Sequence, residues 1–384
     1  MPEPRVAFAV AAPGLSPILE AEAKALGLSI LGADDAGVRF VGDAASVRRA
    51  NLHLRTATRV LVRIAAFEAR GFPELERRAR QIVWSPWLLR GTAVRLRVTS
   101  KKSKLYHTAA IAERLEHVLA GHGVEVHRGV VAADEDDDTR DSAEQLLVVR
   151  VYRDAVTISA DASGALLHRR GWRLATAKAP MRETLAAALL HASGWPGNVP
   201  LVDPLAGSGT IGIEAATLAR GLAPGLHRRF AFEQWPEHDA EAWQWERDAV
   251  REAALPRAPA PIVLNDRDAG AIAAIRANAE RAGVLGDLDI RHGPATAVEY
   301  PLARGWIVSN PPYGKRVTGG ADLRDLYGSL GRAWARRAPG WHLSLVCEGP
   351  TMARGFGIPL APRVTTRNGG LAIAFCSGVI PEEI

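Results

Sequence analysis

The sequence predicts an α/β protein in which a mostly parallel sheet, covered by helices on both faces, follows a smaller α+β region. Beyond residue 182, short apolar runs that are typical of buried strands alternate with longer helical patterns. Loops with glycine or polar residues follow three of these runs. In such a sheet, the loops at the carboxyl ends of the strands are where ligands bind. Residues 1–160 instead mix short strands and helices without a regular order.

The first residues predict a strand followed by a helix. The apolar run at residues 6–12 could imitate a short secretion signal. Glu3 adds the wrong charge for such a signal, and Pro13 and Gly14 interrupt the run, so we expect a first strand in a cytoplasmic protein. A helix is expected over residues 16–27.

The next hundred residues predict a small compact module of strands and helices. Helices are expected over residues 72–83 and 108–120, with strands at residues 93–98, 147–151 and 155–159. A segment rich in glycine, histidine and arginine, at residues 161–182, then connects this module to the strand–helix alternation.

Positive charge is concentrated in the N-terminal half. Residues 48–97 hold twelve arginines against three glutamates, whereas the net charge of the whole chain is only +6. Concentrated arginine indicates a polyanionic partner, although an arginine-rich proteome would give the same composition on solvated helix faces. The following loop continues the pattern and adds aromatic rings, with Lys101, Lys102, Lys104, Tyr106 and His107.

A glycine turn lies between a predicted strand at residues 199–202 and a predicted helix at residues 211–220. Glycine has no Cβ, so the backbone N–H groups of such a turn can approach a ligand closely. The turn lacks the Gly-x-Gly-x-x-Gly spacing of a dinucleotide site, and no lysine follows it as in a phosphate-binding P-loop. Its residues are Asp203, Pro204, Leu205, Ala206, Gly207, Ser208, Gly209 and Thr210.

An acidic loop follows the next predicted strand, at residues 261–264. Asp266 lies at the end of this strand, beside Arg267, and a helix is expected over residues 269–282. A carboxylate at this place in a doubly wound sheet can accept both ribose hydroxyls of a nucleoside cofactor.

A third loop, Ser309-Asn310-Pro311-Pro312-Tyr313-Gly314, follows a predicted strand at residues 306–308. The Asn310 side chain and the Pro311 carbonyl can accept the hydrogens of an amine, while Tyr313 can stack on a flat ring. Neither Pro311 nor Pro312 has a backbone N–H, so their carbonyls stay available as acceptors. Taken alone, the loop could be an ordinary proline turn at the end of a strand.

Composition narrows the class of protein further. Of the 384 residues, 47% are hydrophobic and 23% charged, which is typical of a globular protein without a membrane span. Cys347 and Cys376 are the two cysteines, and both lie in apolar runs, so we expect core residues and neither a disulfide framework nor a metal site. His168 is expected to pack or to bond backbone rather than to bind a metal.

The glycine turn, the acidic strand end and Asn-Pro-Pro-Tyr occur in an order that resembles the class I S-adenosylmethionine-dependent methyltransferases that act on amines. This resemblance implies a Rossmann-like domain with a mostly parallel seven-stranded sheet and S-adenosylmethionine as cofactor. It implies catalytic roles for Asn310, Pro311, Pro312 and Tyr313. The implied cofactor contacts are Asp203, Pro204, Ala206, Gly207, Ser208, Gly209, Thr210, Asp266, Arg267 and Asn310.

Four further segments resemble the THUMP-domain guanine-N2 RNA methyltransferases, namely residues 103–108, 167–173, 179–186 and 230–235. The resemblance implies a ferredoxin-like region (1–55), a THUMP RNA-binding domain (56–160), a linker (161–182) and a catalytic domain (183–384). It implies methylation of the exocyclic N2 amine of a guanosine in structured RNA, either transfer RNA or 23S ribosomal RNA. The sequence does not fix the oligomeric state, and a monomer is favoured. The implied RNA contacts are Lys101, Lys102, Lys104, Tyr106, His107, Arg169, Arg170, Lys315 and Arg316.

One departure from the family pattern leaves alternatives open. Pro294 stands where an acidic residue commonly contacts the adenine amine of the cofactor, and its side chain cannot accept a hydrogen bond. Either a backbone carbonyl replaces that contact, or cofactor affinity is reduced. Pro294 thus leaves open an inactive RNA-binding or ribosome-assembly factor. A second alternative is an adenine-N6 or protein-glutamine methyltransferase, since these enzymes share loops like Asn-Pro-Pro-Tyr.

Overall fold

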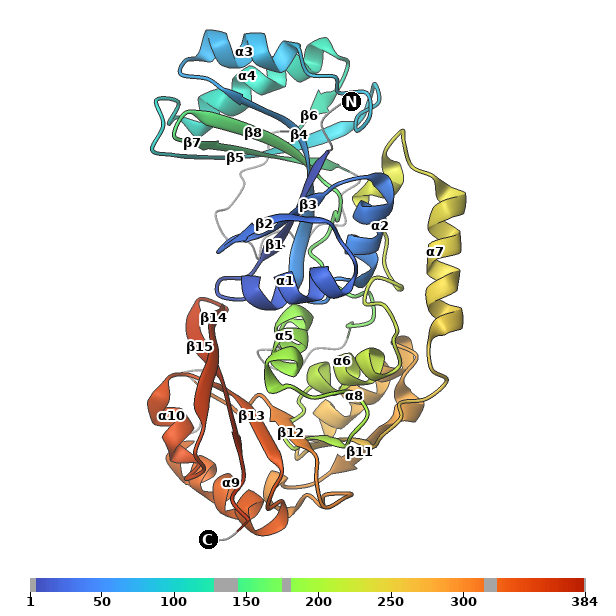
Figure 1. Cartoon of the computed structure of the whole chain (residues 1–384), viewed down its shortest axis with the longest axis vertical. Coiled ribbons are helices and arrows are strands. Elements are labelled where there is room, and N and C mark those ends of the chain that lie inside the picture. Colours follow the sequence, from blue (N-terminus) through green and yellow to red (C-terminus); the bar gives the residue numbers. More distant parts are fainter. Residues whose placement is uncertain (1–4, 128–143, 175–180, 314–322, 383–384) are drawn as a thin grey trace.

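Two β-sheets form the framework of the molecule (Figure 1). The computed structural model describes residues 5–127, 144–174, 181–313 and 323–382. The first sheet lies in the N-terminal half of the chain and the second in the C-terminal half. The predicted fold class, an α/β domain behind a smaller α+β region, is confirmed.

The first sheet has eight strands in the order β2-β3-β1-β4-β8-β7-β5-β6. Helices α1 (Ser16–Ala25) and α2 (Ala44–His53) accompany its first strands, and α3 (Phe72–Arg80) and α4 (Thr108–Gly121) its last ones. The helices predicted at residues 16–27, 72–83 and 108–120 are therefore confirmed. The strands are β1 (Val6–Ala11), β2 (Ile30–Asp34), β3 (Gly37–Val41), β4 (Ala57–Glu68), β5 (Ala93–Lys101), β6 (Glu125–Val126), β7 (Gln145–Tyr152) and β8 (Ala155–Asp161).

Strand β4 joins the two halves of this sheet. Its first residues pair with β1 and its later residues pair with β8, both in the antiparallel direction. Two separate apolar clusters lie under the two halves, one containing Phe40 and Leu52 and the other containing Ile111 and Leu147. One continuous sheet therefore has two cores, and β4 contributes to both parts.

The second sheet has seven strands in the order β11-β10-β9-β12-β13-β15-β14, and β15 runs antiparallel to both of its neighbours. The predicted, mostly parallel seven-stranded sheet is confirmed. Its strands are β9 (Leu201–Asp203), β10 (Ile262–Asp266), β11 (Leu288–His292), β12 (Trp306–Ser309), β13 (His342–Cys347), β14 (Ala361–Asn368) and β15 (Leu371–Val379). Its helices are α5 (Glu183–Ser193), α6 (Thr210–Ala219), α7 (Ala240–Ala253), α8 (Ala269–Arg281), α9 (Leu323–Arg337) and α10 (Pro350–Gly355).

The central strands of this sheet are buried on both faces, as parallel strands between two helical layers must be. Leu264 and Val308 pack with the helices α5, α6 and α8, whereas Val263 and Ile307 pack with α9 and α10. Helix α6 lies very close to the sheet, because a Cβ on Gly212 would come within 2.1 Å of Leu264 Cδ2. Cys347 and Cys376 are free thiols buried in neighbouring strands, which confirms their place in the core.

The two halves of the chain are joined by a buried polar cluster. Glu214 of α6 accepts hydrogen bonds from Arg55 Nη1 at 3.2 Å and from Arg170 Nε at 3.0 Å. Arg170 also donates to the carbonyl of Arg55 at 2.6 Å. Helix α7 adds a second connection, since Glu246 pairs with Arg48 of α2 at 2.8 Å along the flank of the molecule (Figure 1). The position of α6 relative to the N-terminal half is thus set by buried charged contacts.

The described residues contain neither a membrane-spanning helix nor a cluster of metal ligands. No helix among them is long and apolar enough to cross a membrane. Nor do these residues contain a group of three or more metal-ligating side chains that could hold an ion.

Candidate active site

The three loops singled out in the sequence meet at one edge of the second sheet. Strands β10, β9 and β12 are neighbours and parallel, so their carboxyl ends lie side by side. Asp266, Asp203 and Ser309 are the last residues of these three strands. Three loops that lie well apart along the chain, after Asp203, Asp266 and Ser309, therefore form one site.

The glycine turn is fastened to the neighbouring strand β10. The N–H of Ala206 donates to the carbonyl of Asn265 at 3.0 Å, and the N–H of Gly207 donates to Asp266 Oδ2 at 2.8 Å. Asn265 Nδ2 also donates to the carbonyl of Pro204 at 3.2 Å. Gly207 and Gly209 have φ values of 55° and 85°, a left-handed conformation in which a side chain would be strained. The turn thus needs both glycines to bring its backbone up to the site.

The acidic loop is held by backbone contacts on both sides. Asp266 Oδ1 accepts from the N–H of Asp268 at 3.0 Å, and Asp268 in turn caps the start of α8. Asp266 is therefore half-buried with its carboxylate at the glycine turn. Arg267 points into solvent, and its carbonyl is 3.1 Å from His292 Nε2. The position of Asp266 fits a carboxylate that accepts hydrogen bonds from ribose hydroxyls. The exposed side chain of Arg267 is less well placed to contact the cofactor.

The Asn-Pro-Pro-Tyr loop carries an acceptor without a partner. Asn310 Oδ1 is buried and has no hydrogen-bond partner among the described residues. The carbonyl of Pro312 accepts from the Tyr327 hydroxyl of α9 at 2.7 Å, and the Tyr313 hydroxyl accepts from Asn368 Nδ2 of β14 at 2.8 Å. A buried acceptor left unpaired costs free energy unless a ligand supplies the donor. The loop is thus held from two sides while Asn310 Oδ1 stays ready for a donor.

Asp203 connects the glycine turn with this loop. Its Oδ1 accepts from Ser309 Oγ at 2.6 Å and from the N–H of Leu205 at 3.2 Å. Burial of the side chain, which is 1% exposed, raises the pKa of Asp203 to about 7, and the hydrogen bond from Ser309 opposes that shift. A cationic group bound beside Asp203 would favour its ionised form.

Thr210 is part of a second polar group that the sequence did not reveal. Arg173 Nη2 donates to Thr210 Oγ1 at 2.6 Å and also to the carbonyl of Met181, while its Nε lies 3.3 Å from Glu183 Oε1. Burial raises the pKa of Glu183 to about 7, opposed by the positive charge of Arg173. Arg173 and Glu183 stand in the runs at residues 167–173 and 179–186 that resemble the family linker, and this resemblance was the signal in the sequence for this group.

Pro294 lies directly after β11, close to the acidic loop. It precedes a short 3-10 helix and is exposed, with its carbonyl accepting from the N–H of Ala297 at 3.0 Å. The neighbouring Gly293 donates its N–H to the carbonyl of Asp266 at 3.0 Å. Pro294 therefore lies in a loop bonded to Asp266 through Gly293, and its own side chain offers no acceptor for an adenine amine.

The residues predicted to contact RNA fall into two groups. Lys101, Lys102, Lys104, Tyr106 and His107 are all exposed, and the Tyr106 and His107 rings lie 4.1 Å apart. Arg169 is half-buried in the linker. Lys315 and Arg316 lie outside the described residues.

Arg170 does not fit the predicted RNA contact. Its side chain is 1% exposed, and its guanidinium donates to Glu214 and to the carbonyls of Arg55 and Leu167. A buried guanidinium whose three nitrogens all donate inside the protein cannot reach a phosphate without breaking these bonds. We therefore correct its role to that of a structural residue.

The fold and the site together fit one cofactor chemistry. The backbone cradle at Gly207 and Gly209, the carboxylate of Asp266 and the unpaired Asn310 Oδ1 suit a nucleoside with a transferable methyl group and an amine acceptor. These features define a class I methyltransferase, and its cofactor is S-adenosylmethionine. Residues 170–368 match the family described as the RMKL-like methyltransferase domain, and residues 7–61 match the RlmL ferredoxin-like domain. The chain belongs to this methyltransferase family.

Individual relatives agree with this assignment. The chain is 30% identical to "Putative RNA methyltransferase slr0064" from Synechocystis, over 95% of this chain and 94% of that protein. It is 34% identical to the ribosomal RNA large subunit methyltransferase K/L of Syntrophotalea carbinolica, over 98% of this chain but only 54% of the relative. The chain thus spans about half the length of that relative. The solved structure of SMU.472 complexed with SAH covers the whole chain with 26% identity and a TM-score of 0.85.

Proposed function

We propose that this protein transfers a methyl group from S-adenosylmethionine to the exocyclic N2 amine of a guanosine in structured RNA. The buried, unpaired Asn310 Oδ1 is the observation that supports an amine substrate most directly. An amine donates hydrogen bonds and therefore satisfies this acceptor. A carbon atom or a thioether sulfur has no such hydrogen to donate. RNA as the substrate is supported by the names of the relatives, which are RNA methyltransferases.

The loop residues would prepare the amine for reaction. When bound, S-adenosylmethionine supplies an electrophilic methyl group, so the protein has mainly to align three atoms in a line. The lone pair of a guanine amine is delocalised into the ring, and hydrogen bonds to Asn310 Oδ1 and the Pro311 carbonyl would turn it toward the methyl carbon. The amine nitrogen then forms a bond to that carbon as the sulfur–carbon bond breaks, S-adenosylhomocysteine leaves, and the amine gives one proton to solvent.

Tyr313 would hold the base in the site. A base inside a helix is out of reach of such a loop, so it must be unstacked before reaction. The hydrogen bond from Asn368 to the Tyr313 hydroxyl and the bond from Tyr327 to the Pro312 carbonyl keep this part of the loop in place for stacking. We assign the cofactor to the other two loops, through Asp203, Pro204, Ala206, Gly207, Ser208, Gly209, Thr210 and Asp266.

The N-terminal half would bind the RNA outside the active site. Residues 56–160 are proposed as a THUMP RNA-binding domain, behind a ferredoxin-like region at 1–55 and in front of the linker at 161–182 and the catalytic domain at 183–384. The exposed loop with Lys101 and Tyr106 lies next to the β7–β8 turn, where Arg150 and Arg153 lie over the Tyr152 ring. Cations and exposed rings together suit phosphates and unstacked bases. Such substrates place the reaction in the cytoplasm.

The test is methyl transfer with a matched pair of variants. Labelled methyl groups from S-adenosylmethionine are offered to unmodified transfer RNA and ribosomal RNA, and the labelled nucleoside is identified by digestion and mass spectrometry. We expect N2-methylguanosine with the wild type and with Asn198→Ala, an exposed residue at the opposite edge of the sheet. Asn310→Ala should lower kcat by roughly a hundredfold or more, with the affinity for S-adenosylhomocysteine kept.

Other outcomes decide between this proposal and its alternatives. Label on adenine N6 of DNA, or on protein, would show that the Asn-Pro-Pro-Tyr loop acts on a different amine substrate. Absence of label from every acceptor, with intact cofactor binding, would favour a binding or assembly factor. A wild-type rate for Asn310→Ala would refute the role of Asn310.

A further inference from the structure

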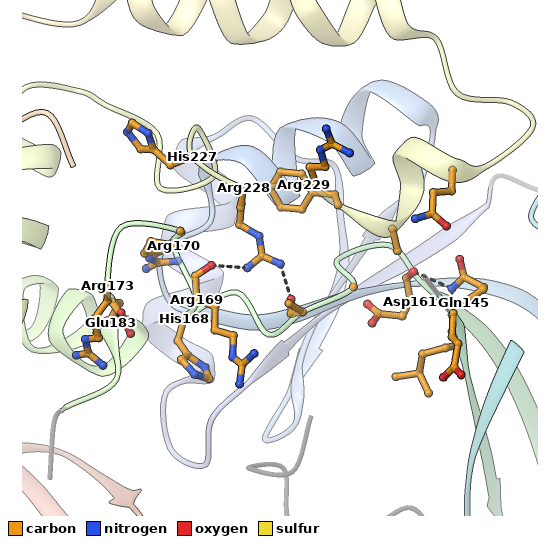
Figure 2. Close-up of a pocket in the computed structure, with 18 of the residues that line it drawn as sticks. Gln145, Asp161, His168, Arg169, Arg170, Arg173, Glu183, His227, Arg228 and Arg229 are labelled. Atoms are coloured by element: carbon orange, nitrogen blue, oxygen red, sulfur yellow. Dashed lines mark hydrogen bonds and ion pairs between the residues drawn. The ribbon is translucent and has the colours of Figure 1, made fainter. Parts of the chain in front are cut away.

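A large cleft separates the first sheet from the catalytic domain. Its volume is about 880 Å³, and it is lined by the first sheet, by the linker after β8 and by the loop before α7 (Figure 2). Arg95 and Gln145 lie at the sheet side, His168 and Arg169 come from the linker, and Arg229 from the loop. None of the described residues of the three active-site loops lines it, so the cleft is a separate feature of the molecule.

The cleft has a surplus of positive charge. Among its described lining residues are three carboxylates, and each is paired with an arginine: Asp161 with Arg59, Glu144 with Arg95, and Glu183 with Arg173. Arg169, Arg228 and Arg229 add further guanidinium groups to the lining. Burial, and after it the positive charges of Arg170, Arg169, Arg173 and Arg228, lower the pKa of His168 to about 3. The potential in the cleft therefore favours an anion.

Arg228 fixes the wall from which these charges project. Its guanidinium donates to the carbonyls of Leu166 at 2.7 Å, of Arg169 and Ser163 at 3.0 Å, and also of Ala165 (Figure 2). A Cβ on Gly171 would come within 2.1 Å of the carbonyl of His227, so the linker and the loop before α7 are in close contact. The side chains of His168 and Arg169 extend from this linker in the same direction (Figure 2). The basic wall is thus held in place before any ligand binds.

The cleft reaches from the first sheet toward the cofactor turn. At one end Arg95 belongs to β5, the strand that leads into the exposed basic loop beginning at Lys101. At the other end Arg173 and Glu183 line the cleft, and Arg173 bonds to Thr210 at the end of the glycine turn. A chain that lies in the cleft and continues along β5, from Arg95 to Lys101 at the other end of the strand, would therefore connect the catalytic domain with the basic loop of the N-terminal half.

We propose that this cleft binds the phosphate backbone of the RNA segment that runs between the basic loop and the active site. A positively charged groove that follows the backbone is the usual means of holding nucleic acid without reading its sequence. Arg169 and Arg229 contact phosphates, and Arg228 acts only as a positioning residue for the wall. This inference rests on the proposed function, because it takes RNA as the substrate.

The salt dependence of RNA binding tests this assignment. The double variant Arg169→Gln/Arg229→Gln is compared with the wild type by fluorescence anisotropy with a labelled structured RNA over a series of salt concentrations. The plot of log affinity against log salt should become shallower by about 0.7–0.9 for each phosphate contact removed. KM for RNA should rise while the affinity for S-adenosylhomocysteine, measured by calorimetry, stays the same.

Two controls make the result decisive. Arg304→Gln removes an exposed arginine before β12, at the opposite edge of the sheet, and should leave the salt slope unchanged. Arg229→Glu reverses one exposed charge, so a folded variant with weaker RNA binding remains available if the double variant unfolds. A wild-type salt slope in either cleft variant, with RNA still methylated, refutes the role of the cleft in RNA binding and leaves the proposed function standing. Failure of the wild type to bind or methylate any RNA overturns the proposed function itself.

Discussion

Replacement of Glu214 by glutamine tests whether the buried cluster fixes the two halves of the molecule together. Glu214 is 2% exposed at its side chain and accepts from Arg170 Nε at 3.0 Å and from Arg55 Nη1 at 3.2 Å. Glutamine has the same shape but no charge, so the change leaves two buried guanidinium groups facing each other. The backbone N–H of Arg55 also donates to Glu22 Oε1 at 2.5 Å, and this bond does not involve Glu214.

The expected loss follows from burial. Removing one partner of a buried ion pair costs about 3–5 kcal/mol, because the remaining charge stays desolvated. We expect about 3 kcal/mol, since the glutamine oxygen can still accept one hydrogen bond. At about 2.1 cal/mol/K per residue, the 384 residues correspond to roughly 0.8 kcal/mol per degree. The midpoint of thermal unfolding should therefore fall by about 4 °C.

A matched exposed pair provides the control. Arg5 and Glu237 form an ion pair at 2.5 Å with side chains that are 42% and 49% exposed. Exposed pairs contribute about 0–1 kcal/mol, so Glu237→Gln should lower the midpoint by about 1 °C or less. Scanning calorimetry of both variants measures the difference. Equal shifts in the two variants would show that burial of Glu214 does not have the assumed energetic effect.

Three further predictions concern the site. Burial raises the pKa of Asp203 to about 7, so the folded protein keeps a proton that the unfolded chain releases above about pH 4, and this stability is lost as the pH rises through about 7. Asp203→Asn mimics the protonated form and should be more stable than the wild type at about pH 8 but not at about pH 4 in thermal unfolding; a constant difference would contradict this pKa. Gly212→Ala should destabilise by about 1–3 kcal/mol in denaturant unfolding, because its Cβ would collide with Leu264; wild-type stability would mean that the helix moves away freely. Tyr327→Phe removes the donor to the Pro312 carbonyl and should lower kcat in the methyl-transfer assay while S-adenosylhomocysteine affinity stays the same; a parallel loss of cofactor affinity would refute its action through the loop.

Local patterns in the sequence were enough to locate the elements of the site. The strands β9, β10 and β12 are short, apolar and bounded by polar loops, so their positions follow from residue type alone. Asp266 and Asn310 were placed at strand ends for the same reason, and the parallel sheet brings those ends together. The glycines of the turn were recognisable because few other residues can adopt their backbone conformation.

Contacts between residues that are far apart in the sequence could not be predicted from such local patterns. The sequence contains Arg169 and Arg170 side by side with identical chemistry, and both line the cleft, yet Arg169 is half-buried whereas the guanidinium of Arg170 is buried against Glu214. Arg173 and Glu183 were likewise ordinary charged residues until packing brought them to the cofactor turn.

The sequence by itself thus determined the order of the motifs along the chain, the class of chemistry and the residues at the strand ends. Only the tertiary structure decided which arginines are structural, which acceptor lacks a partner, and where a basic cleft lies. The physical reason is that backbone preferences and apolar periodicity act over a few neighbouring residues. The burial of a charge depends instead on what the whole fold places around it.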